Sequence, residues 1–230
     1  MTPAVPAGTV VVLRDGPTGL EVLMLRRAAT LAFAAGNWVF PGGQVDQADL
    51  TAAPLGPDGY LGEQPAARRA AAREAAEEAG LELDPADLVP LSHWLPPATA
   101  PRRYSTWIFL AAAPAAATVA VDGGEITAHV WAAPRDVLAR RDAGELALLP
   151  PTWLSLWQLA RYGRTTSALQ AARRTAPGVF RPRMVAVDGH TVSVYAEDAG
   201  YHGDPAADGP RHRLILDPAG WRYERTFSAT

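Results

Sequence analysis

One stretch of the sequence, from Arg73 to Leu81, constrains the fold more than any other. It reads Arg-Glu-Ala-Ala-Glu-Glu-Ala-Gly-Leu, and it ends a run from Pro65 that is rich in alanine, arginine and glutamate, which are strong helix formers. Pro65 suits the first turn of a helix, where its missing N–H is not needed, and Gly80 suits the position just beyond a helix end. The sequence therefore predicts a helix over residues 65–79.

Three carboxylates lie on one face of this predicted helix. Glu74, Glu77 and Glu78 are three and four positions apart, so their side chains project in the same direction. Like charges at this spacing repel by roughly a few tenths of a kcal/mol per pair. A hard divalent cation such as Mg2+ would reverse the sign of that energy, because it takes oxygen ligands from carboxylates and from substrate phosphates. The alternative is an ordinary solvated face, on which Arg73 and Glu77 form a surface ion pair.

The composition bounds the remaining possibilities. The chain has 230 residues, of which 48% are hydrophobic, enough for a sizeable core. A formal net charge of -3 argues against nucleic acid as the main partner, and no basic run favours a membrane surface. The chain has no cysteine, which excludes disulfides, thiolate nucleophiles and cysteine-bound zinc. Because neither a signal peptide nor a long apolar run is evident, we expect a cytoplasmic protein.

Apolar runs and turn residues divide the rest of the chain. Strands are expected over residues 8–13, 20–25, 38–40, 88–95, 104–113 and 126–132, and helices over residues 134–141, 151–162 and 166–174. Residues 46–64 hold several Pro, Gly and Asp without a clear period and are interpreted as an inserted loop. From residue 181 onward the apolar residues alternate. The sequence thus predicts one domain over residues 1–175 and a mostly β extension over residues 176–230.

Two motifs together resemble those of a known family. The block from Arg73 to Leu81 matches the second half of the Nudix box, R-E-U-x-E-E-x-G-U with U aliphatic, and Phe40-Pro41-Gly42-Gly43 resembles the turn that opens the box. This resemblance implies an α/β fold, a Nudix α/β/α sandwich around a mixed sheet, here with a small C-terminal α+β extension. It also implies a metal-dependent pyrophosphohydrolase.

The spacing of the box departs from the family's pattern. Thirty positions separate Gly43 from Arg73, about 16 more than in the family, and the extra residues fall where the family has a loop before its catalytic helix. Counting back from Arg73 leads to Gly59 instead, but the Phe-Pro-Gly-Gly context favours Gly43. Glu63 is the stand-in for the first glutamate of the box, although it is two positions too far from Arg73.

Two other segments are similar to the Nudix branch related to the acyl-coenzyme A diphosphatases: Leu25-Arg26-Arg27 and Pro101-Arg102-Arg103-Tyr104-Ser105-Thr106. In the second segment that branch has Phe and Asp where this chain has Tyr104 and Ser105. By this resemblance, Arg26, Arg102 and Arg103 would bind substrate, either its phosphates or the 3′-phosphate of coenzyme A; the alternative is that they are simple surface charges.

The resemblance also assigns roles at the box. The ligands of Mg2+ or Mn2+ would be the carbonyl of Gly42 and the side chains of Glu74, Glu77 and Glu78. Arg73 would hold a glutamate side chain in place, and Glu125, in a glycine turn outside the box, is the candidate base. The predicted catalytic residues are Arg73, Glu74, Glu78 and Glu125. None of the five histidines has metal-ligand spacing.

The predicted reaction is attack of water on a nucleoside diphosphate linked to another group. Coenzyme A or acyl-coenzyme A is the favoured substrate, and ADP-ribose or a dinucleotide is the alternative. A Nudix domain that binds a ligand without catalysis is a second alternative, against which the three clustered glutamates argue. The expected partner is a small molecule, with no nucleic acid and no membrane, and a homodimer is compatible with the sequence.

Overall fold

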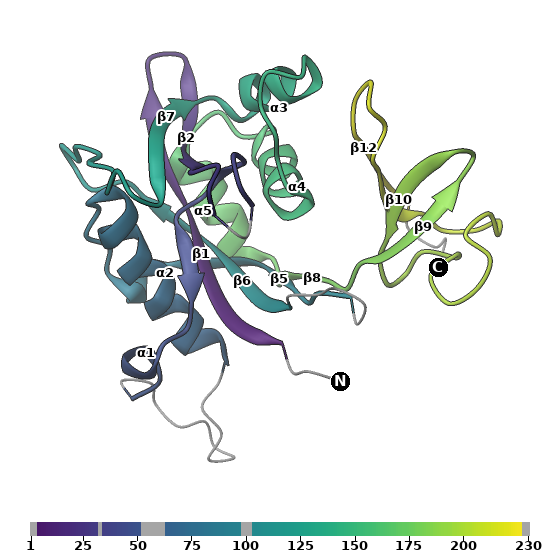
Figure 1. Ribbon diagram of the computed structural model, residues 1–230, viewed down its shortest axis with the longest axis horizontal. Coiled ribbons are helices and arrows are strands. Elements are labelled where there is room, and N and C mark those ends of the chain that lie inside the picture. Colours follow the sequence, from purple (N-terminus) through teal and green to yellow (C-terminus); the bar gives the residue numbers. More distant parts are fainter. Residues whose placement is uncertain (1–3, 32–33, 52–62, 98–102, 227–230) are drawn as a thin grey trace.

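A mixed sheet of eight strands forms the centre of the molecule in a computed structural model, which describes residues 4–31, 34–51, 63–97 and 103–226 (Figure 1). Its strands are β1 (Val5–Gly16), β2 (Gly19–Arg27), β3 (Trp38–Val39), β4 (Gly42–Gln44), β5 (Val89–Trp94), β6 (Tyr104–Ala112), β7 (Ile126–Ala132) and β8 (Gly178–Phe180). The order is β3-β2-β1-β6-β5-β8, with β4 paired to β1 and β7 paired to β2. The β1–β6 and β5–β8 pairs are parallel and the others are antiparallel.

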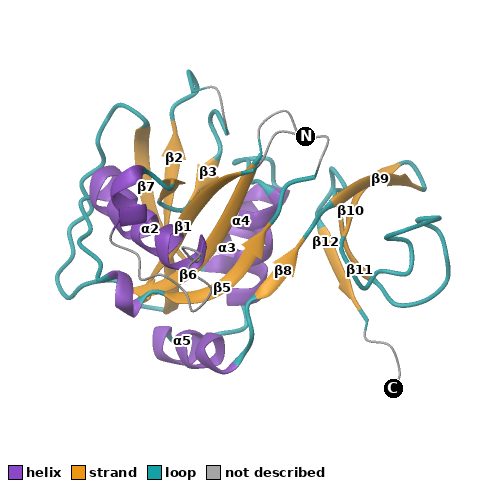
Figure 2. Ribbon diagram, turned by 90° about the horizontal axis from the view of Figure 1, so that it is seen from below, coloured by secondary structure: helices purple, strands orange, loops and turns teal. Residues whose placement is uncertain are grey.

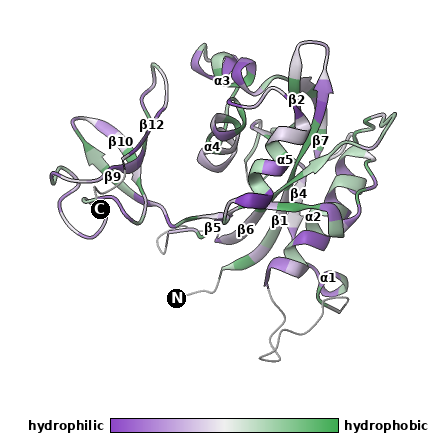
Figure 3. Ribbon diagram, turned by 180° about the vertical axis from the view of Figure 1, so that it is seen from behind, coloured by the Kyte–Doolittle hydropathy of each residue, from purple (hydrophilic) through white to green (hydrophobic). Residues whose placement is uncertain are grey.

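Alternation along β1 divides the core into two parts. Val10 and Val12 pack in the cluster that contains the alanine face of α2 (Glu63–Ala79), whereas Val11 and Leu13 pack in the cluster on the other side of the sheet. Successive side chains of a strand point to opposite faces, so a strand covered on both faces is apolar at every position. The concentration of hydrophobic residues along the central strands is visible in Figure 3.

The second face of the sheet is covered by α3 (Pro134–Asp142), α4 (Pro150–Leu159) and α5 (Thr165–Arg174) (Figure 2). Trp153, Leu154 and Leu169 are buried there against β1, β2 and β6. Each such side chain stabilises the fold by roughly 1.5–3 kcal/mol when fully buried. With α2 on the opposite face, the predicted α/β/α sandwich around a mixed sheet is confirmed.

A second, antiparallel sheet follows the first (Figure 1). Its order is β12-β11-β10-β9, from β9 (Arg183–Val187), β10 (His190–Val194), β11 (His212–Ile215) and β12 (Arg222–Arg225). It contacts α3 and α4 through Trp221, which lies under Arg141, and Tyr223, which packs edge-on against Trp157. The β character expected from residue 181 onward is present, and the domain boundary near residue 175 stays a prediction.

The inserted loop differs in part from its prediction. Residues 47–51 form a short helix, α1 (Gln47–Thr51), and residues 52–62 lie outside the described part of the chain. Helix α2 begins at Glu63, two residues before the predicted start, so Pro65 lies in its first turn. A short 3-10 helix, η1 (Pro85–Asp87), leads from α2 towards β5. Across the described ranges, no helix has the length and apolar character that spanning a bilayer requires.

Candidate active site

The C-terminal half of α2 lies against the turn at Pro41 and the two glycines, Gly42 and Gly43, with which β4 begins. Glu74 packs so closely on Gly43 that a Cβ there would collide with its carboxylate. Glu78 is only 6% exposed, and its Oε2 accepts a hydrogen bond of 3.0 Å from the backbone N–H of Gly42. Gly80 ends the helix with a φ of 67°, a conformation that other residues rarely adopt. Two of the three predicted acids therefore face the turn.

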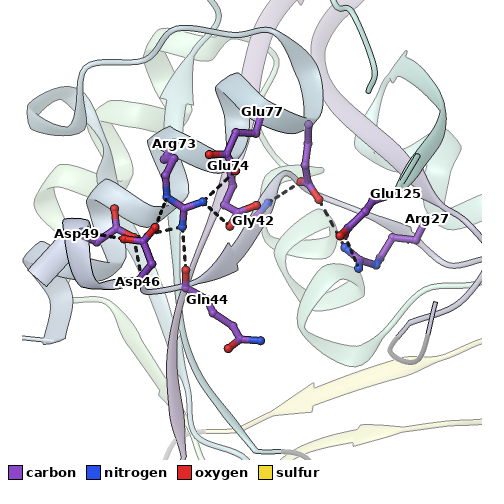
Figure 4. A network of polar contacts seen from close by, with 10 residues as sticks. Arg27, Gly42, Gln44, Asp46, Asp49, Arg73, Glu74, Glu77 and Glu125 are labelled. Carbon is purple, nitrogen blue, oxygen red and sulfur yellow. Dashed lines mark hydrogen bonds and ion pairs between the residues drawn. The ribbon is translucent and has the colours of Figure 1, made fainter. Parts of the chain in front are cut away.

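Arg73 is the centre of a polar network on the same helix (Figure 4). Its Nη1 donates to Glu74 Oε1 and Glu77 Oε2, both at 2.9 Å. Its Nη2 donates to the carbonyl of Gln44 at 2.9 Å and to Asp49 Oδ2 at 3.2 Å. Burial opposes the charged form, but the contacts with Asp49 and Glu74 raise the pKa of Arg73 above its usual value. The predicted contact between Arg73 and a glutamate is present.

Asp49 takes the place for which the sequence suggested Glu63. Asp49 is 4% exposed, lies six positions after Gly43 and pairs with Arg73. Glu63 was the wrong choice. It precedes Arg73 by ten residues, about 15 Å along the helix axis, and its Oε1 lies 3.7 Å from Nε2 of His93. Counting forward from Gly43 would have found Asp49, because the extra residues come after it.

Asp46 and Asp49 support each other at the start of α1. Asp46 N–H donates to Asp49 Oδ2, and Asp49 N–H donates to Asp46 Oδ1, both at 3.0 Å. Backbone hydrogen bonds, with that from Asp49 the largest cause, and the nearby Arg73 lower the pKa of Asp46. These two hydrogen bonds fix Asp49, which pairs with Arg73 on the side opposite to the glutamates.

Burial and neighbouring charge perturb the two glutamates that face the turn. Burial, the largest cause, together with Glu74 and Glu125, raises the pKa of Glu78 to about 7, although the Gly42 N–H and Arg27 act in the opposite direction. Burial also raises the pKa of Glu74, against the effect of Arg73. Carboxyl groups with shifted pKa values cluster at functional sites, because burial and neighbouring like charges are combined there.

Arg27 and Glu125 complete the site on the side away from Arg73 (Figure 4). Arg27 Nη1 lies 3.5 Å from Glu78 Oε1, and Nη2 lies 3.2 Å from Glu125 Oε2. The candidate base from the glycine turn is therefore close to the box helix, with its side chain 59% exposed. Arg27 was not predicted as a site residue.

The predicted substrate-binding arginines are placed differently. Arg26 adjoins Arg27 on β2, so its side chain points to the opposite face of the sheet, and the structure does not bring it to the glutamates. Arg103 directly precedes β6, and its carbonyl accepts a hydrogen bond from Val5 N–H at 2.7 Å. Arg102 lies outside the described residues.

The donor set fits a hard divalent cation. Glu74 and Glu78 offer carboxylate oxygens, the ligands that Mg2+ and Mn2+ prefer. Burial is the main cause of the raised pKa of Glu78, with the charges of Glu74 and Glu125 adding to it, and a bound cation would offset the cost of ionising this side chain. Glu77, 58% exposed, is turned towards Arg73, and within the described ranges no three acidic or histidine side chains gather in metal-binding geometry. Ligation by Glu77 would require its rotamer to change.

A domain model and several solved structures are similar to this chain. Residues 4–150 match the NUDIX domain model. A NUDIX hydrolase from Alicyclobacillus acidocaldarius is 28% identical, with a TM-score of 0.63 over 74% of this chain and 97% of that one. A MutT NUDIX hydrolase from Burkholderia pseudomallei (24% identity, TM-score 0.49) aligns over 69% of this chain and 99% of its own. The NUDIX domain of Shewanella oneidensis NrtR, complexed with ADP ribose (18%, 0.49), aligns over 70% and 88%. No curated protein matches the chain.

The family match, together with the fold and the acidic face of α2, makes the protein a hydrolase of nucleoside diphosphate derivatives. The domain match covers well over half of the chain, so the chain belongs to the NUDIX family. The protein is accordingly a pyrophosphohydrolase, of a family whose members generally use divalent metal ions.

Proposed function

We propose that the protein hydrolyses the diphosphate linkage of coenzyme A or an acyl-coenzyme A in the presence of Mg2+ or Mn2+. The observation that carries the hydrolytic part is the placement of Glu74 and Glu78 against the Gly42-Gly43 turn. The choice of coenzyme A is supported by the resemblance of the segments around Arg26 and Arg102 to the acyl-coenzyme A diphosphatase branch.

In the proposed reaction, water adds across the P–O–P linkage and yields 3′,5′-ADP and a phosphopantetheine product. A divalent cation would supply neutralisation of the diphosphate and a lower pKa for the attacking water. Glu74, Glu77 and Glu78, with the carbonyl of Gly42, would hold it. Glu125 would accept the proton of the water as its oxygen attacks phosphorus.

The network around Arg73 would keep this arrangement in place. Arg73 fixes Glu74 by a charge-assisted hydrogen bond of 2.9 Å, a kind about twice as strong as a neutral one, whereas Glu77 would have to leave Arg73 to reach the cation. Much of the rate enhancement would come from positioning and from charge stabilisation at phosphorus.

A substrate panel tests the proposal. Purified protein with Mg2+ or Mn2+ should hydrolyse coenzyme A, and its kcat/KM should fall with dephospho-coenzyme A, which lacks the 3′-phosphate. Equal kcat/KM values on the two compounds would show that the enzyme does not recognise the 3′-phosphate. Faster hydrolysis of ADP-ribose or NADH would establish the alternative substrate class.

A Nudix domain that only binds its ligand is tested with Glu78→Gln, which keeps the shape of the side chain and removes its charge. The wild-type protein should show metal-dependent turnover that this variant loses. Absence of turnover by the wild-type protein on every compound of the panel would instead indicate a binding protein.

A further inference from the structure

A single guanidinium joins three separate segments at the site. Arg27 is the last residue of β2, and its side chain is only 16% exposed. Nη1 faces Glu78 on α2 at 3.5 Å, and Nη2 faces Glu125, in the turn before β7, at 3.2 Å (Figure 4). The two carboxylates contact different nitrogens, so the planar fork of the guanidinium spans the space between them.

A β-bulge lies beside Arg27, between β2 and β7, close to the turn that carries Glu125. The pairing of β2 with β7 shifts register here, because Arg26 is opposite Ala128 whereas Arg27 is opposite Ile126. Thr127 is the extra residue, and its Oγ1 donates to the carbonyl of Arg26 at 3.3 Å. Bulges of this kind re-aim side chains and are frequent beside active sites. The bulge lies directly between the regular part of β7 and the turn that carries Glu125.

The backbone of Glu125 is fixed independently of its side chain. Asp122 accepts hydrogen bonds from the N–H groups of Glu125 and Ile126, both at 2.9 Å. The carbonyl of Glu125 accepts from Ala28 N–H at 2.8 Å. The main chain at this position is thus held on both sides. The side chain is mostly exposed, and its one ion pair within the described residues is with Arg27.

We propose that Arg27 is a positioning residue. It holds the carboxylate of Glu125 close to Glu78, where Glu125 accepts the proton of the attacking water. The proposal rests on the proposed function, in which Glu125 accepts the proton of water. Two carboxylates this close repel each other, and an exposed glutamate would otherwise sample several rotamers directed into solvent. A forked cation removes the repulsion and selects one rotamer. A lysine has a single ammonium group and could not contact both acids with the same geometry.

A double-mutant cycle in kcat tests this coupling. Glu125→Gln should lower kcat by about 100-fold, within the usual range for a general base. Arg27→Gln should lower kcat by ~10-fold or more with KM changed less than about threefold, and Arg27→Lys should restore little of it. The double variant should be no slower than Glu125→Gln alone, because Arg27 acts through Glu125. Multiplying effects in the double variant, or full activity of Arg27→Gln, would overturn the proposal.

A second readout separates this role from loss of folding or of metal binding. The affinity for Mn2+, followed by electron paramagnetic resonance, should not fall in Arg27→Gln, because this variant removes a positive charge beside Glu78, whereas a role confined to holding Glu78 as a ligand predicts weaker binding. Arg14→Gln is the matched control, because Arg14 also lies on a strand of this sheet and pairs with Glu21 at 2.7 Å, away from the site. It should retain wild-type kcat. An inactive wild-type protein would refute the proposed function itself, and an active wild-type protein with an unaffected Arg27→Gln would refute only the positioning role.

Discussion

Replacing Glu78 with glutamine should stabilise the metal-free protein above about pH 7 while abolishing its activity. Burial, with the neighbouring carboxylates, raises the pKa of Glu78 from 4.5 to about 7. Ionising this group in the folded state therefore costs about 3 kcal/mol relative to the unfolded chain. Glutamine never carries that charge, and its side-chain oxygen can still accept the hydrogen bond from the N–H of Gly42.

The dependence on pH gives this prediction its sign. Below pH 4.5, Glu78 is protonated in both the folded and the unfolded state, so the wild type and the variant should be equally stable. Between 4.5 and about 7 the unfolded chain ionises first, and the wild type loses stability progressively. Above that range the full cost is present. The advantage of the variant should thus grow with pH to about 3 kcal/mol and then remain constant.

Urea unfolding in a chelator, at about pH 5 and about pH 8.5, measures this difference. Glu77→Gln is the control, because Glu77 lies on the same helix but is largely exposed, and its free energy of unfolding should change by less than about 1 kcal/mol. Added Mg2+ should stabilise the wild type and reduce the advantage of Glu78→Gln. A Glu78→Gln variant that is no more stable than the wild type at the higher pH would refute the reasoning.

Three further predictions concern the surroundings of the site and the second sheet. Gly43→Ala should displace the carboxylate of Glu74 and lower kcat/KM by ~10-fold or more, measured by steady-state kinetics, with little change in melting temperature. Asp49→Ala should leave the guanidinium of Arg73 without its buried partner and destabilise the fold by about 2 kcal/mol in urea unfolding, whereas Glu63→Ala should leave turnover intact. Asp198→Ala should cost about 3 kcal/mol, because it breaks a buried ion pair of the second sheet, while the active site keeps its affinity for Mn2+.

The sequence predicted those strands and helices whose own residues carry a clear hydrophobic period or a strong propensity. The apolar runs of β1 and β2 and the alanine-rich run of α2 carry their period in the sequence, and their positions agree with the structure within a few residues. The short strands β4, β8 and β12 were not predicted. Each has only three or four residues of ladder pairing, and they exist because a neighbouring strand offers hydrogen bonds. Such strands have no periodicity to detect.

The site residues on α2 were predictable from the sequence. Those that other segments bring to α2 were harder to predict. Helical spacing places Glu74 and Glu78 on one face of α2, and the resemblance to the Nudix box assigns them their roles. Asp49 was missed because the count ran backward across inserted residues. The choice between Arg26 and Arg27 depended on the phase of β2, which is buried on both faces along most of its length, so no alternation of polar and apolar residues reveals that phase.

The hydrogen bonds and ion pairs of Arg73 and Arg27 indicate that the two residues have different roles at the site. The terminal nitrogens of Arg73 carry four N–H bonds, and the structure gives them four acceptors: three carboxylates and a backbone carbonyl. Arg73 therefore has no terminal donor left for a phosphate and acts as a scaffold for the acids. The terminal nitrogens of Arg27 contact two acids at 3.5 and 3.2 Å. The charge of Glu74 raises the pKa of Glu78 more than the charge of Arg27 lowers it, so a negative potential remains around Glu78. That remaining negative potential gives a divalent cation, and through it a diphosphate, an electrostatic reason to bind at this end of α2.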